Sequence, residues 1–409
     1  MHSPKIVLAA LATLCFGVSS TGCSAHSPVP PPPATLTIAA QIEHLDTLVR
    51  EPMVVQHQSG ALFVAGYNRV RPGLWKSADN GATWTRVDVG TASQGAVGNS
   101  DVDLAIAPDG TLYFVSMGYD NKLREGTHVA IGVSRDVGAT WRWTTVSRMR
   151  FDDRPWIDVA PDGTAHVVWN DGNGVNHSVS RDGGITWTRM ARVHDRGGSS
   201  HLAVGPHGEI AVRITPGAAS SNKCDEGTDL VAISADAGAT WRKHAAPGSP
   251  RASGCGDDAR AIPRWVDPIA WDAAGALHAL WTTPAGVWVG RSQDQGATWT
   301  NARIADDADA YFPYLVARAE GELAATWFTG VDSTLRWRVA RVNVRGTTSA
   351  NTSAPMPIES MRGDPSRRDP GGEYLATALL RDGTIAVVTP IQHESAHRLG
   401  FTWWRFELR

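Results

Sequence analysis

The sequence lacks most of the features that make a function easy to name. Charged residues account for only 19% of the 409 residues, the formal net charge is −3, and no long basic run occurs, which argues against a nucleic-acid partner. No Gly-x-Ser-x-Gly or phosphate-loop motif is present, and most histidines are scattered, so no cofactor or metal site is predicted. No apolar run reaches the roughly 20 residues that a membrane-spanning helix needs.

Residues 1–22 are predicted to be an export signal that is removed. The apolar segment 6–18 has the length of a signal-peptide core. The sequence Ser-Thr-Gly-Cys ending at Cys23 resembles a bacterial lipobox, and the resemblance implies that Cys23 is acylated. Ser24 after it implies an outer-membrane lipoprotein facing the periplasm or the cell surface; plain secretion is the alternative. The Pro-rich segment 23–34 is predicted to be a linker.

Cysteine is scarce, with four residues in all, two of them within the first 23 positions. The remaining two, Cys224 and Cys255, form an even pair in a chain that is predicted to be exported. Such a pair is typical of a disulfide. The bond would close a loop of about 32 residues and stabilise the fold by roughly 3–4 kcal/mol in the chain-entropy model. Two free buried thiols are the alternative.

One octamer, Ser-x-Asp-x-Gly-x-Thr-Trp, occurs five times. It suits a hairpin turn, because aspartate accepts hydrogen bonds from backbone N–H groups, glycine supplies a positive φ, and Thr-Trp begins the next strand. The octamers resemble the Asp-box, or BNR, repeat of sialidases and related β-propellers. A turn is needed in each repeat whereas a catalytic group is needed once, so the aspartates are predicted to be structural. The boxes are 77–84 (Asp79), 134–141 (Asp136), 180–187 (Asp182), 234–241 (Asp236) and 292–299 (Asp294).

A second repeat consists of an apolar run, a Gly-containing turn and another apolar run, which is typical of a β-hairpin. Seven such hairpins occur, the last two without a box. A four-stranded repeat is one propeller blade, so residues 35–409 are predicted to form a single all-β propeller of seven blades, each with four antiparallel strands; six blades, as in sialidases, are the alternative. Segment 35–42 is left over and is predicted to complete the last blade. The turn glycines are Gly60, Gly110, Gly163, Gly208, Gly275, Gly321 and Gly383.

The first residues of the innermost strands are predicted to form a shared pocket. In a closed ring the innermost strands run along the central channel, so one hairpin entry from each blade reaches the same place. These entries are rich in polar and aromatic residues. Arginines there would bind anionic groups, and tryptophans would stack on a sugar face. The candidate ligand-binding residues are Arg50, Arg154, Trp156, His201, Arg264, Trp265 and Tyr311.

The resemblance to sialidases implies a more specific chemistry. A sialidase holds its substrate carboxylate with three arginines and uses a tyrosine nucleophile that a glutamate activates. The position of the central arginine holds Trp281-Thr282-Thr283 in this sequence, which departs from the family pattern. The positions that match are Arg50 before Pro52 for the first arginine, Arg336 or Arg338 for the third, Tyr374 for the nucleophile, Asp101 or Asp103 for the acid/base, and Asp267 in place of the glutamate.

These observations favour an envelope-anchored propeller that recognises a ligand, a glycan or another small anionic molecule, in its central pocket. The membrane would be contacted through the lipid anchor alone. Two alternatives stay open. The first is a sialidase-like exo-glycoside hydrolase with Tyr374 as nucleophile, so the sequence does not decide whether the protein is an enzyme. The second is a non-catalytic scaffold that docks an envelope protein.

Overall fold

The described part of the chain consists of β-strands and the turns and loops between them, with almost no helix. The computed structural model describes residues 35–68, 70–195, 197–215, 229–248, 267–330, 335–358, 372–393 and 397–409, all within the unit Ala34–Arg409. Within these ranges no helix is long and apolar enough to cross a membrane. Several predictions fall outside them: the signal and linker of residues 1–34 with Cys23, the cysteine pair Cys224 and Cys255, and the site candidates Arg264 and Trp265.

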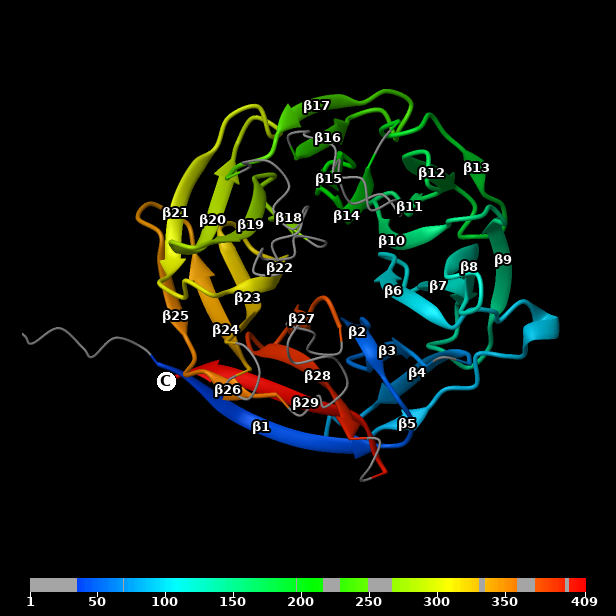
Figure 1. Cartoon of the computed structure of the whole chain (residues 1–409), viewed down its shortest axis with the longest axis horizontal. Coiled ribbons are helices and arrows are strands. Elements are labelled where there is room, and N and C mark those ends of the chain that lie inside the picture. Colours follow the sequence, from blue (N-terminus) through cyan, green and yellow to red (C-terminus); the bar gives the residue numbers. More distant parts are fainter. Residues whose placement is uncertain are drawn as a thin grey trace, which may run out of the picture. The chain divides into compact units, whose positions relative to one another are not determined.

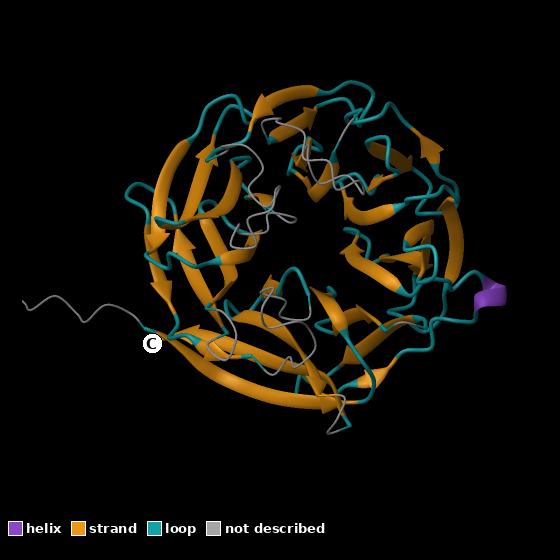
Figure 2. Cartoon of the chain, in the orientation of Figure 1, coloured by secondary structure: helices purple, strands orange, loops and turns teal. Residues whose placement is uncertain are grey.

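Seven antiparallel sheets stand around a common centre, which confirms the predicted seven-bladed propeller (Figures 1 and 2). Within the described ranges the one short helix is η1 (Ala92–Gln94), between blades 1 and 2. From the innermost strand outwards, the blades are β2 (Arg50–Gln56), β3 (Leu62–Tyr67), β4 (Pro72–Ser77) and β5 (Thr85–Arg86); β6 (Ser100–Ile106), β7 (Leu112–Asp120), β8 (Glu125–Ser134) and β9 (Arg142–Ser147); β10 (Asp153–Val159), β11 (Ala165–Asn170), β12 (Val175–Ser180) and β13 (Thr188–Arg189); β14 (Gly198–Val204), β15 (Ile210–Thr215), β16 (Leu230–Ser234) and β17 (Arg242–Ala245); β18 (Ile269–Trp271), β19 (Leu277–Thr283), β20 (Gly286–Ser292) and β21 (Thr300–Ala305); β22 (Tyr311–Ala317), β23 (Glu322–Thr329), β24 (Arg336–Asn343) and β25 (Ser349–Thr352), with β26 (Met356–Pro357) also paired to β24; and β27 (Ala376–Leu379), β28 (Ile385–His393), β29 (Arg398–Leu408) and β1 (Leu36–Leu45).

Burial within a blade is greatest in the middle strands. The second strands β3 and β11 are buried at every residue, because both faces of each blade are covered by its neighbours. The outermost strands β5 and β13 are two residues long and exposed. Short exposed outer strands offer little unpaired backbone to another chain.

The five Asp-boxes join the third and fourth strands of blades 1 to 5 and share one hydrogen-bond pattern. In the first box, the Asp79 carboxylate accepts hydrogen bonds from the N–H of Thr83 (2.9 Å) and from its hydroxyl (2.6 Å). These bonds, the hydroxyl of Thr83 first, lower the pKa of Asp79 to about 2. The indole of Trp84 donates to the carbonyl of Gly81 (3.1 Å) and packs on Trp403 of the last blade, with ring centroids 5.2 Å apart. Each carboxylate is therefore engaged in its own turn.

The N-terminal strand closes the ring. Strand β1 pairs antiparallel with β29 from Leu36 opposite Leu408 to Leu45 opposite Gly400, so the blue strand lies outside the red one in Figure 1. The prediction that segment 35–42 completes the last blade is confirmed, and the strand extends three residues beyond it. The pairing covers the backbone edge of β29 that would otherwise be free.

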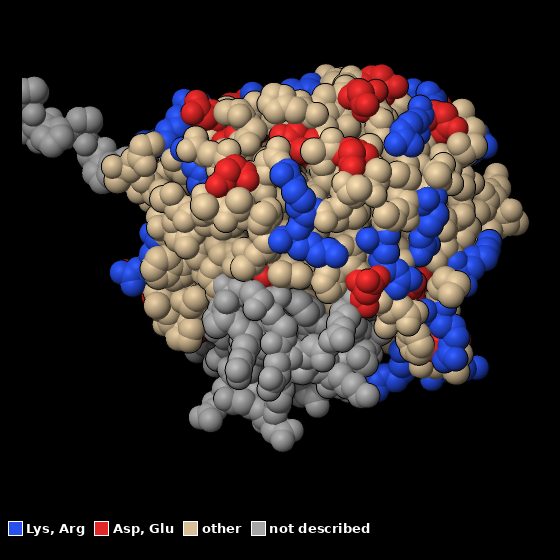
Figure 3. All heavy atoms as spheres, turned by 90° about the horizontal axis from the view of Figure 1, so that it is seen from above, with Lys and Arg blue, Asp and Glu red and all other residues tan. Residues whose placement is uncertain are grey.

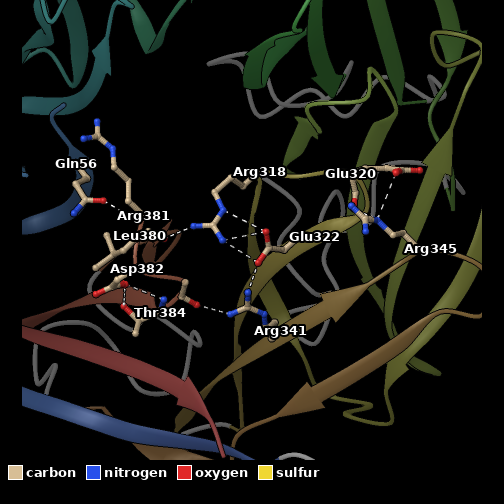
Figure 4. A network of polar contacts seen from close by, with 11 residues as sticks. Gln56, Arg318, Glu320, Glu322, Arg341, Arg345, Leu380, Arg381, Asp382 and Thr384 are labelled. Carbon is tan, nitrogen blue, oxygen red and sulfur yellow. Dashed lines mark hydrogen bonds and ion pairs between the residues drawn. The ribbon is translucent and has the colours of Figure 1, made fainter.

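A polar network links the last two blades to the first (Figure 4). The Arg318 guanidinium of blade 6 donates to Glu322 (3.1 and 3.2 Å) and to the carbonyl of Leu380 in blade 7. The next residue, Arg381, donates its backbone N–H to the side-chain oxygen of Gln56 in blade 1 (2.9 Å). Ring closure is thus supported by side chains as well as by β1.

The box glycine of blade 1 provides a test of the packing across the closure. Gly81 and Gly60 have the same backbone conformation, with φ of 90° and 91°, but an added Cβ at Gly81 would collide with the Trp403 indole, whereas at Gly60 it would meet nothing within 4 Å. We expect Gly60→Ala to lower the free energy of unfolding by about 1–2 kcal/mol through backbone strain alone, and Gly81→Ala by roughly 2–3 kcal/mol more through overpacking. Urea unfolding of both variants measures the difference; equal losses would contradict the packing described.

Candidate functional site at the propeller hub

Three innermost strands begin with the same strained turn. Glu51, Arg154 and Phe312 have φ values of 43°, 48° and 45°, each precedes a proline, and each lies at a shift in strand register. A non-glycine residue in this region of φ is strained, and a bulge at the start of a strand redirects the adjacent side chains. The strain is therefore concentrated where the blades converge on the centre.

Charged side chains from four blades meet at these strand starts. The Arg154 guanidinium forms a two-pronged pair with Glu373, with Nη1–Oε2 and Nη2–Oε1 distances of 2.7 and 3.1 Å, and lies 3.7 Å from the Asp153 carboxylate. The side chains of Arg154 and Glu373 are 13% and 30% exposed, so the group is sheltered but reachable. We call this group the hub cluster; it consists of Arg50 and Glu51 from blade 1, Asp101 from blade 2, Asp153 and Arg154 from blade 3, and Glu373 from blade 7.

Carboxylates outnumber arginines in the hub cluster by four to two, and this excess affects their protonation. Burial, then the neighbouring charges of Asp101 and Glu373, raises the pKa of Glu51 well above its usual value. Burial also raises the pKa of Asp153 to about 7, although the Arg154 guanidinium opposes the shift. Both carboxyls therefore hold protons at a pH where an exposed carboxyl has lost them.

A layer of buried rings lies one step further along the same strands. Trp156 packs between His201 and Tyr374, with ring centroids 5.1 and 5.7 Å away, and Tyr314 contacts both His201 and Tyr374 at 5.6 and 5.8 Å. Trp156 is only 3% exposed. In this arrangement Trp156 is part of the wall under the hub cluster and presents no free face on which a sugar could stack.

The hydroxyl of Tyr374 lies in acidic surroundings. Burial raises its pKa well above the usual value for tyrosine, and the charges of Glu51, Asp101 and Asp103 raise it further. The guanidinium of Arg50 lies 5.8 Å from the ring centre of another tyrosine, Tyr67. The phenolate form that a tyrosine nucleophile needs is thus disfavoured.

Asp101 and Asp103 are only two residues apart and have different surroundings. Asp101 faces the hub cluster. The carboxylate of Asp103 accepts the backbone N–H of Leu104 (2.8 Å) and that of Ile157 in the next blade (2.9 Å), and burial raises its pKa to about 8. Asp103 thus links blades 2 and 3, which is a positioning role.

The remaining candidates contact residues outside the hub cluster. Asp267 is 3.0 Å from Arg213, which also lies 3.2 Å from Asp229 in a fully buried group. Arg338 pairs with Asp307 at 3.0 Å on β24, the third strand of blade 6, with β22 and β23 between it and the centre. On the same strand, the Arg336 guanidinium donates to a neighbouring carbonyl (2.8 Å), and the ring of Tyr311 packs on two phenylalanines of its own blade.

Three residues of the hub cluster were not among the candidates drawn from the sequence. Glu51, Asp153 and Glu373 each lie beside a residue that was chosen, at the start of an innermost strand or just before it. The sequence feature that could have identified them is their position beside an X-Pro pair or at a hairpin entry. Which of two adjacent side chains points towards the centre depends on the bulge at the start of the strand, and the sequence patterns do not predict this orientation.

One metal-binding pattern was also overlooked in the sequence. Residues 393–397 read His-Glu-Ser-Ala-His, the pattern that binds zinc when it lies on a helix. Here His393 ends β28 and is paired with Arg398, the first residue of β29; residues 394–396 lie outside the described ranges. Among the described residues no group of three or more His, Cys, Asp or Glu side chains is placed to hold a metal ion.

The fold and its repeats define a β-propeller built with BNR/Asp-box repeats. The family model of the BNR/Asp-box repeat matches residues 178–189, and no curated protein matches the sequence. The fold is similar to YCF48 from Cyanidioschyzon merolae (TM-score 0.54, 13% identity, 90% of this chain and 98% of that one), to an α-L-arabinanase of Penicillium chrysogenum (0.49, 13%, 91% and 98%), and to a Hadza microbial sialidase (0.46, 17%, 68% and 63%). At such identities the likeness shows the fold alone, and the chain spans less than two thirds of the sialidase.

The buried carboxyls make stability depend on pH in a defined window. The folded state keeps protons on Asp103, Glu51 and Asp153 that the unfolded chain loses near pH 4, so stability is lost as pH rises through the folded pKa values. Buried histidines act in the opposite sense and only below their unfolded pKa of about 6.5; burial lowers the pKa of His166 to about 4, of His177 to about 3 and of His201 to about 4.

Between pH 7 and 8 the carboxyls therefore act alone. We expect the free energy of unfolding to fall by roughly 1–3 kcal/mol over this unit, and Asp103→Asn to reduce the slope by up to about 1 kcal/mol per unit. Urea unfolding at several pH values measures both slopes. A stability that stays constant or rises between pH 7 and 8 would contradict the description of these groups.

Proposed function

We propose that the hub cluster binds an uncharged, hydroxyl-rich sugar residue of a glycan. The observation that carries the proposal is the convergence of four carboxylates and two arginines from four blades on one sheltered place. Carboxylates accept hydrogen bonds from pairs of neighbouring hydroxyl groups, and arginine donates to ring and hydroxyl oxygens. The Arg154–Glu373 pair fixes two of these groups before a ligand arrives, which lowers the entropy lost on binding.

The charge balance supports a neutral ligand over an anionic one. Arg154 already interacts with Glu373 and Asp153, so an incoming carboxylate would compete with two carboxylates of the protein. The raised pKa of Tyr374 and the pairing of Arg338 with Asp307 also leave sialidase chemistry unsupported. Export and acylation at Cys23 stay predictions and are independent of this argument.

A glycan array and titration calorimetry test the binding site. We expect the protein to bind neutral glycans, and Asp101→Asn and Glu373→Gln each to weaken binding at least about tenfold, because each removes a charged acceptor from a sheltered site. Glu43→Gln is a matched control, since Glu43 pairs with Arg398 on the outer strands of blade 7 and its loss should leave affinity unchanged. Binding that survives both hub variants, or a preference for sialylated glycans, would refute the proposal.

A second candidate function is hydrolysis of a glycosidic bond, and one observation favours it. Glycosidases need one carboxyl that is protonated near neutral pH and a second that is ionised. Asp153, with its pKa raised to about 7, lies on one side of Arg154, and Glu373 accepts both prongs of the same guanidinium. Asp153 would be the acid and Glu373 the base.

Release of nitrophenol from neutral nitrophenyl glycosides tests the enzyme. We expect turnover to decline as pH rises through about 7, since Asp153 then loses the proton it must donate, and Asp153→Asn to lower kcat at least about a hundredfold while glycan binding persists. Tyr374→Phe should retain activity, whereas a tyrosine nucleophile would require its loss. Absence of turnover on all neutral substrates, with binding intact, would leave the protein a lectin.

A further inference from the structure

Two neighbouring loops on the hub face carry exposed apolar side chains among cations. Inner strands begin on this face, so the β7–β8 turn and the β9–β10 loop lie on it, while the Asp-boxes lie on the opposite face. Leu123, Met149 and Phe151 are 65%, 54% and 39% exposed. We call residues 121–124 and 148–151 the basic tip; its cations, all exposed, are Lys122, Arg124, Arg148 and Arg150.

The two loops are held together as one rigid feature. Arg150 forms a two-pronged pair with Glu125, with Nε–Oε1 and Nη2–Oε2 distances of 2.9 and 2.7 Å. The backbone N–H of Phe151 donates to the carbonyl of Gly126 (2.9 Å), and the N–H of Met149 donates to the carboxylate of Asp152 (3.0 Å). The exposed side chains are thus presented by a fixed backbone.

The fold sustains strain to present these side chains. Arg124 and Phe151 have φ values of 56° and 67°, a region that is unfavourable for side chains of this size. Phe151 is 39% exposed, although it lies beside Gly172 and has the Arg150 guanidinium 5.1 Å from its ring centre. Such strain, together with an exposed apolar group, is typical of a functional contact.

The surface that a partner would meet at the basic tip is cationic. The nearby acids Glu125 and Asp152 are buried, at 5% and 0% exposure, and are engaged by Arg150 and by the Met149 N–H. The third acid, Asp120, accepts backbone N–H groups of the turn itself (2.7 and 3.0 Å). On the side of the disc drawn in Figure 3, Lys and Arg side chains gather towards the right-hand end, the end at which Figure 1 places blades 2 and 3.

We propose that the basic tip inserts into the surface of an anionic lipid bilayer. Leucine, methionine and phenylalanine surrounded by arginine and lysine suit the boundary between acyl chains and acidic headgroups. A polysaccharide offers no apolar layer to the exposed side chains of Leu123, Met149 and Phe151. The contact would turn the hub face towards the membrane. This proposal does not depend on what the hub cluster binds.

Vesicle co-sedimentation tests this proposal on the full chain carrying Cys23→Ser, so that no acyl chain at that residue contributes. We expect binding to vesicles with about 30% phosphatidylglycerol to exceed binding to pure phosphatidylcholine, and to weaken in about 0.5 M salt. Arg124→Gln should lower the partition coefficient about fivefold. The triple variant with serine at Leu123, Met149 and Phe151 should lower it at least about tenfold.

The matched control is Ile185→Ser, since Ile185 is 44% exposed in an Asp-box on the opposite face and should not affect binding. All variants change exposed side chains, and thermal unfolding checks that each is folded. Binding that is equal in the triple variant and the control, or absent in the parent chain, would overturn the proposal. If the triple variant lost binding to a soluble acidic polysaccharide while its vesicle binding stayed unaffected, the result would overturn the proposal in favour of a polysaccharide partner.

Discussion

The pairing of β1 with β29 is the constraint on which the rest of the structure depends. It joins the two ends of the propeller and holds seven sheets in a ring, a closure whose entropic cost grows only slowly with chain length. The hub cluster spans this closure, because Glu373 precedes the last innermost strand and binds Arg154 of blade 3, 219 residues away in the chain. Without the ring, these charges would have no common place to meet.

The architecture was largely predictable, because short sequence patterns that repeat from blade to blade indicate its turns and strands. Each Asp-box determines its own turn through contacts within eight residues, as in Ser77 to Trp84. Each hairpin is indicated by a glycine between two apolar runs. Segment 35–42 could be assigned to the last blade because the seven hairpins left this one strand without a partner, and pairing it there would cover the free edge of the last blade. Local patterns of this kind can be recognised in a single sequence.

The site was predictable in place but not in detail. The hairpin entries do converge, yet the interaction that each side chain makes depends on residues from other blades. Arg154 was expected to meet an anionic ligand, but Glu373 and Asp153 already hold it. Asp101 and Asp103 were indistinguishable as candidates. Asp101 lies at the register shift between Ser100 and Val102 and faces the hub cluster, whereas Asp103 lies in the regular part of the strand and accepts a backbone N–H of the next blade. Such pairings exist only after the ring has closed.

Residues with a strained backbone conformation occur on both faces of the propeller, but in different kinds of turn. In the boxes, residues such as Asn80 and Val137 also have positive φ, but each box repeats the same turn and the same hydrogen bonds of aspartate and serine compensate the strain. On the hub face, Glu51, Arg154 and Phe312 share one strained turn before a proline in three of the seven blades, and Arg124 and Phe151 are strained in the basic tip. Outside the boxes, the strained residues are therefore concentrated on the face that carries the hub cluster and the basic tip.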